Sequence, residues 1–121
     1  MKKILIIVVL TITSLSTYSQ TVKCNDLLNL IVENGYKKAT LQSYQLSSSW
    51  LYKVTAYSND YKIYVVAEIK ENEYSYKTST YIFCGIPSMN WQNFQYGGYG
   101  DPSSYGKRFH KYIIDYQCNC N

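Results

Sequence analysis

Hydrophobic and polar positions alternate through the middle of the chain. Three runs show this two-residue period, at residues 50–57, 61–70 and about 75–84, with polar turns at 58–60 and 71–73. The period is typical of β-strands with one face toward a core, and short polar turns favour an antiparallel meander. The core-facing positions that it predicts are Trp50, Tyr52, Val54, Ala56, Ile63, Val65, Ala67 and Ile69.

The segment before these strands has a helical spacing. Asn25 or Asp26 is a suitable N-cap, and Gly35 stands where a left-handed C-terminal cap belongs. Residues 40–46 then predict a short strand that the serines at 47–49 end. The apolar positions of the expected helix are Leu27, Leu28, Ile31 and Val32.

The helical period returns after Pro87, which cannot continue a central strand. Ser88 is expected to cap a helical turn, and a glycine-rich stretch follows at 96–100. Asp101 before Pro102 predicts the N-cap of a last helix, with Lys107 and Lys111 in water. The apolar stripe of that helix is Tyr105, Phe109, Tyr112, Ile113 and Tyr116. We therefore predict an α+β fold: an N-terminal helix, a meander of three or four antiparallel strands, and one or two C-terminal helices on one sheet face.

The first residues have the pattern of an export signal. Lys2 and Lys3 precede an apolar run at residues 4–15, which is shorter than the roughly 20 residues of a membrane-spanning helix. We expect residues 1–19 to be a signal peptide cleaved after Ser19, so that no stable membrane span remains. An uncleaved anchor is the alternative, whereas Lys23 excludes a lipoprotein signal at Cys24. The predicted location is outside the cytoplasm, either periplasmic or secreted.

Four cysteines remain after cleavage: Cys24, Cys84, Cys118 and Cys120. An even number in a small exported domain predicts two disulfides. Cys118 and Cys120 are expected to pair elsewhere and not with each other, because a bond between two cysteines so close together in an extended tail would be strained. A metal site built from Cys-x-Cys and His110 is the weaker alternative. We predict no metal and no cofactor.

Net charge limits the classes of partner. The chain has 12 basic and 8 acidic residues, and losing Lys2 and Lys3 leaves 10 minus 8, a charge of +2. This is far from the polycationic character of most nucleic-acid-binding domains.

Two stretches resemble the KTSC family, a short domain found alone in bacterial proteins and at the C-terminus of some lysyl-tRNA synthetases. The first, around Tyr81, Phe83 and Pro87, is similar to the family's Tyr-x-Tyr motif with its following proline, with phenylalanine as the second aromatic residue. The second is similar to the family's Ser-x-Gly-x-x-Phe-x-x-x-Ile ending, in which the matching residues are Ser104, Gly106, Phe109 and Ile113. The resemblance implies a KTSC-like domain at 49–117, preceded by a helix and connecting segment at 20–48 and followed by a cysteine-containing tail at 118–121. It also brings a suggestion of RNA binding, which an exported protein would seldom use.

Tyrosine is the main compositional anomaly, with 15 residues. Most are explained by strands and core. Tyr96, Tyr99 and Tyr105 instead flank glycines, where rigid amphipathic rings can make contacts at little entropic cost. The nearby cations Lys107, Arg108 and Lys111 are either a solvated helix face or part of the same contact surface.

No catalytic motif accompanies these residues. Serine elbows, paired carboxylates and phosphate-binding loops are absent from the sequence, and His110, the one histidine, is the one candidate general base at neutral pH. The sequence therefore favours an exported, non-catalytic binding module with an unknown protein or glycan partner. The alternatives are an RNA-binding domain and a small hydrolase using His110.

Overall fold

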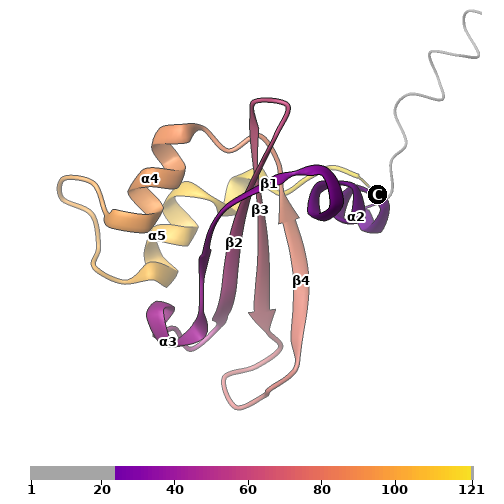
Figure 1. Cartoon of the computed structure of the whole chain (residues 1–121). Coiled ribbons are helices and arrows are strands. Elements are labelled where there is room, and N and C mark those ends of the chain that lie inside the picture. Colours follow the sequence, from indigo (N-terminus) through magenta and orange to yellow (C-terminus); the bar gives the residue numbers. More distant parts are fainter. Residues whose placement is uncertain (1–23, 121) are drawn as a thin grey trace, which may run out of the picture.

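A single antiparallel sheet, with its strands in the order β1-β2-β3-β4, is the centre of the computed structural model (Figure 1). The structure describes residues 24–120, so the predicted signal peptide and cleavage site lie outside the described residues. The α+β class and the antiparallel meander are confirmed. The elements are α2 (Cys24–Asn34), β1 (Tyr36–Leu41), α3 (Ser43–Leu46), β2 (Leu51–Asn59), β3 (Lys62–Lys70), β4 (Thr78–Phe83), α4 (Ser88–Tyr96), α5 (Tyr105–Tyr112) and a 3-10 turn (Ile114–Tyr116).

The turn between β2 and β3 explains the tight pairing of these strands. Asp60 and Tyr61 both have positive φ, at 55° and 64°. Two successive left-handed residues form the type I′ turn, whose twist matches that of an antiparallel hairpin. The register continues without interruption from Asn59 opposite Lys62 to Lys53 opposite Glu68.

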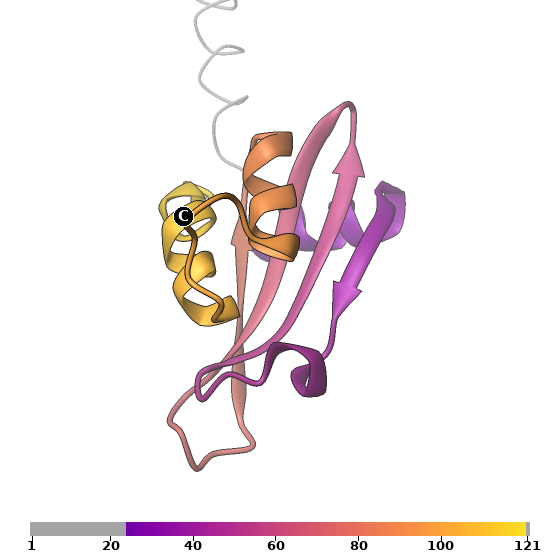
Figure 2. The ribbon, with the colours of Figure 1, turned by 90° about the vertical axis from the view of Figure 1, so that its left-hand side faces the viewer.

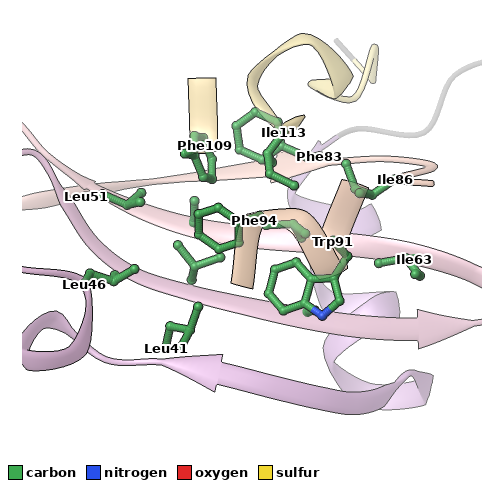
Figure 3. Packing of buried hydrophobic residues seen from close by; sticks show 14 residues of the cluster. Leu41, Leu46, Leu51, Ile63, Phe83, Ile86, Trp91, Phe94, Phe109 and Ile113 are labelled. Atoms are coloured by element: carbon green, nitrogen blue, oxygen red, sulfur yellow. The ribbon is translucent and has the colours of Figure 1, made fainter. Parts of the chain in front are cut away.

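The main core lies between the sheet and the helices α4 and α5, which cover one face together (Figure 2). Figure 3 shows its aromatic centre, where Phe109 packs edge-on against Phe83 and Phe94, with ring centroids 5.3 and 5.7 Å apart. All three rings are essentially inaccessible to solvent. The burial of these rings fixes how α4 and α5 lie on the strands.

A second, smaller cluster lies on the opposite face of the sheet, where α2 packs (Figure 1). Ile31 from α2 meets Tyr57 from β2 and Ile82 from β4, and all three are buried. The same face carries the two predicted disulfides, Cys24–Cys120 and Cys84–Cys118, each with its Cα atoms 5.0 Å apart. The first disulfide joins α2 to the C-terminal tail, and the second joins the end of β4 to that tail.

Three local predictions are corrected. Residues 40–46 are not one strand, since β1 ends at Leu41 and the helical turn α3 follows. Gly35 is not left-handed, and its N–H instead donates to the Ile31 carbonyl at 2.7 Å. The alternation in β2 is interrupted by an irregularity in the register between Leu51 and Lys53. As a result Leu51 is buried in the main core, while Tyr52 is 39% exposed.

Candidate functional site

The predicted contact residues come from the end of α4, from α5 and from the segment between them, residues 97–104, which we call the glycine loop. Tyr96 is 79% exposed and Tyr99 is fully exposed. Lys107 is exposed as well, whereas Tyr105 is half-buried and packs against the main core. The structure therefore presents two of the three predicted tyrosines to solvent.

Arg108 does not belong to a solvent-facing cationic surface, which corrects the prediction for this residue. It is 6% exposed, and its guanidinium group donates to four backbone carbonyls, a set that its planar fork of donors can satisfy simultaneously. Its guanidinium carbon also lies 4.5 Å from the centre of the Tyr105 ring. The accepting carbonyls belong to Phe94 (2.9 Å), Gln95 (3.4 Å), Pro102 (3.1 Å) and Ser103 (2.8 Å).

These bonds have a clear structural effect. Phe94 and Gln95 lie in the last turn of α4, where carbonyl groups lack helical partners and carry partial negative charge. Pro102 and Ser103 lie near the end of the glycine loop, just before Ser104, the N-cap of α5. One buried side chain therefore ties the end of one helix to the start of the next.

Asp101 is likewise not the N-cap that the sequence predicts. Ser104 caps α5, because its hydroxyl accepts the Lys107 N–H at 3.3 Å. The Asp101 carboxylate, whose side chain is 2% exposed, forms an ion pair with Lys111 and accepts hydrogen bonds from the Tyr112 hydroxyl and the Gly98 N–H. It therefore anchors the glycine loop to α5.

The same contacts explain the perturbed acidities. The hydrogen bond from Lys111, followed by that from Tyr112, lowers the pKa of Asp101 from 3.8 to about 2. Asp101 in turn raises the pKa of Lys111 and that of Tyr112, because each hydrogen bond favours the protonated donor. Lys111 is therefore a paired cation and not a free one.

The structure explains why glycine occupies three positions of the loop. Gly97 and Gly100 have positive φ, at 80° and 77°. At Gly98 a Cβ atom would lie 2.9 Å from the Asp101 carboxylate, so a side chain would push this anchor away. Glycine is therefore required at these positions by the backbone conformation and by the close contact with Asp101.

His110 lies exposed on α5, with its ring centre 5.1 Å from that of the partly buried Trp50. Among the described residues it has no acidic hydrogen-bond partner. All four cysteines are in disulfides, so none is a thiolate ligand that could join His110 at a metal. Residues 24–120 contain no group of three His, Cys, Asp or Glu side chains arranged to hold an ion.

Most of the residues on which the KTSC resemblance rests have structural roles. Phe83, Phe109 and Ile113 are in the main core, and Ser104 caps α5. Gly106 lies so close to Trp50 that a Cβ atom would approach the indole nitrogen to 2.8 Å. Pro87 precedes the first residue of α4, and Tyr81 is 39% exposed on β4.

Two hollows involve residues that the sequence did not single out. One, of about 280 Å³, lies between β1 and α4, where Lys38 and Trp91 join Tyr96. The other, of about 490 Å³, lies between α3 and the β3–β4 connection. Tyrosine and serine are abundant in the segments around the second hollow, but only the fold shows that these segments meet.

Comparisons of the chain with protein-family models, with curated proteins and with solved structures found no match. The KTSC resemblance therefore stays a prediction from the residues. Within residues 24–120, no helix combines the length and the apolar character that crossing a membrane requires.

Proposed function

We propose that this chain is an exported, non-catalytic binding module whose contact surface consists of Tyr96, Tyr99 and Lys107. One observation carries the proposal: the exposed tyrosines stand on a backbone that Arg108 and Asp101 hold in place from beneath. Rings on a fixed backbone lose little conformational entropy on binding, which is how aromatic contact residues gain affinity.

Lys38 extends this surface toward β1. It lines the hollow beside Tyr96, so a partner that contacts Tyr96 can also meet a cation there. Two tyrosines with Lys38 and Lys107 suit a partner that offers apolar and acidic groups together. The partner is a protein or a glycan of the cell envelope or the surrounding medium.

Export rests on two independent features. Residues 1–19 have the order of a signal peptide, and the four cysteines form two disulfides, which persist in oxidising compartments. These features support a periplasmic or secreted location.

The competing functions have less support. A hydrolase would need an acid or a nucleophile beside His110. In the part of the chain that the structure describes, the His110 ring instead lies beside the Trp50 ring. RNA binding would draw on the cations of α5, yet Arg108 is buried and Lys111 is paired with Asp101, so Lys107 alone is available there. Affinity for a phosphate backbone falls as the number of such cations falls.

The test is a retention experiment with the immobilised mature chain, in which extracts of the cell envelope and culture medium are passed over matched variants. We expect Tyr96→Ser combined with Tyr99→Ser to lower the amount of the retained partner by about tenfold or more, because exposed aromatic residues dominate interface energies. The control pair is Tyr36→Ser with Tyr61→Ser, which removes two comparably exposed tyrosines elsewhere. Equal retention by both double variants would refute this contact surface.

A further inference from the structure

The hollow between α3 and the β3–β4 connection has the dimensions of a small-molecule site. We call this hollow the tyrosine groove and the connection at residues 71–77 the hairpin loop. Figure 1 shows α3 and the hairpin loop at the same end of the sheet, at the bottom of the view. The volume of the groove, about 490 Å³, falls within the roughly 300–1,000 Å³ of typical ligand pockets. The lining residues are Ser43, Ser47, Ser48, Tyr52, Lys70, Glu73, Tyr74, Ser75 and Tyr76.

Three aromatic rings border this groove. Tyr74 and Tyr76 are 90% and 99% exposed, and Tyr52 is 39% exposed because of the irregularity in β2. None of the three packs into either core cluster. Each therefore offers a flat apolar face and a hydroxyl group to whatever enters the groove.

Serine hydroxyls supply polar contacts beside the rings. The Ser48 oxygen accepts the N–H groups of Trp50 at 3.3 Å and Leu51 at 3.1 Å, and the Ser75 oxygen accepts the Lys77 N–H at 3.0 Å. These bonds orient each oxygen within its own turn. Neither hydroxyl hydrogen has an acceptor among the described residues, so both remain free to donate to a ligand.

The charge of the groove selects against ionic ligands. Lys70 is its one cation and Glu73 its one anion, so the lining has no net charge. A phosphate, a sulfated polymer or a nucleic acid would find no cluster of cations here. The groove suits a ligand that is neutral, has apolar flat faces and carries hydroxyl groups around its rim.

A pyranose ring has this combination, since its C–H groups form apolar faces and its hydroxyls point outward. We propose that the tyrosine groove binds a neutral glycan, with the sugar rings against Tyr74 and Tyr76 and hydroxyl groups bonded to Ser48 and Ser75. This site is separate from the Tyr96–Tyr99 surface and goes beyond the function proposed for it.

The test is affinity electrophoresis of the mature chain in native gels that contain a neutral polysaccharide. Hydroxyethylcellulose, soluble starch and a galactomannan are the neutral probes, and alginate is the charged comparison. We expect at least one neutral polymer to slow the protein, and Tyr74→Ala combined with Tyr76→Ala to reduce the association constant by about tenfold or more. Both substitutions are on exposed side chains, so the melting temperature should stay the same.

The control is Tyr36→Ala combined with Tyr61→Ala, which should migrate as the wild-type protein does. No retardation in any neutral polymer, retardation in alginate alone, or equal retardation of the groove variant and the wild type would each overturn the proposal. The retention experiment on Tyr96 and Tyr99 uses different residues, so failure at one surface is distinguishable from failure at the other.

Discussion

Two tyrosine-bearing loops of this protein are held in different ways. The glycine loop, 97–104, is held by two buried side chains: Arg108, which reaches from α5, and the loop's own Asp101, which bonds to Gly98 and pairs with Lys111 of α5. The hairpin loop, 71–77, is held by its own short-range bonds, such as Glu71 N–H to the Lys77 carbonyl at 3.1 Å and Tyr74 N–H to the Asn72 side chain at 3.0 Å.

The difference shows how a small domain can present the same residue type in two states of order. We expect the buried charge-assisted bonds to hold the first loop in one conformation, and the local turn bonds, which are in contact with water, to open more readily. A partner of the glycine loop would meet a preorganised surface. A ligand of the hairpin loop would help to order the surface that binds it.

The largest expected effect comes from Arg108→Met, which removes the bonds beneath the glycine loop. We expect a loss of about 3 kcal/mol in the free energy of unfolding, because four carbonyls lose their donor in a buried site. Urea unfolding of the mature chain measures it. Arg108→Lys, which keeps the charge but not the planar fork of donors, should recover only part of the loss. A change below about 0.5 kcal/mol for Arg108→Met would show that the loop does not depend on this residue.

A smaller effect is expected at Asp101 and should depend on pH. The pKa of Asp101 is lowered from 3.8 to about 2 in the folded protein, so its contribution to stability is complete above about pH 4 and is lost as the pH falls toward 2. Asp101→Asn removes the charge that Lys111 pairs with and should flatten this part of the profile. Melting temperatures from pH 6 to pH 2 measure the effect. If the melting temperatures of the wild type and of Asp101→Asn fell in parallel with pH, Asp101 would not be the source of this pH dependence.

The smallest effect is expected in the hairpin loop. Asn72→Ala removes the side-chain acceptor of the Tyr74 N–H and should cost about 0.5 kcal/mol or less in global stability, since the bond is exposed. Hydrogen exchange should still separate the two loops. We expect amides of the hairpin loop to exchange at least about tenfold faster than the Gly98 amide, which donates to Asp101 at 2.6 Å. Equal exchange rates for the two sets of amides would show that the two loops are equally ordered.

The residue pattern predicted the fold class because the two-residue and helical periods are strong signals here. Ile63, Val65 and Ala67 face the main core as the alternation requires, and Phe109 and Ile113 do so from the last helix and its end. The phase of β2 was predicted wrongly at its start, since the irregular step between Leu51 and Lys53 turns Leu51 into the main core and leaves Tyr52 exposed. Nothing in the residue types marks that step.

The candidate site was less predictable for a different reason. Arg108 is a long cation on an amphipathic helix, and such residues are usually in water. Its burial depends on carbonyls at the end of α4, which the sequence does not place nearby. Asp101 beside Pro102 has the local pattern of an N-cap, but a contact with Gly98 and side chains ten and eleven residues further along prevailed. The tyrosine groove joins segments from both sides of β2, so it also required the fold.

The Cys24–Cys120 disulfide has a mechanical consequence. It joins positions 96 residues apart in the sequence, so the covalent chain from α2 to the C-terminal tail is closed into a ring. Tension applied at the two ends of the chain would pass through this sulfur bridge and bypass the hydrogen bonds of the sheet. A molecule anchored at one end and pulled at the other would therefore keep both tyrosine surfaces intact under loads that unravel an open chain.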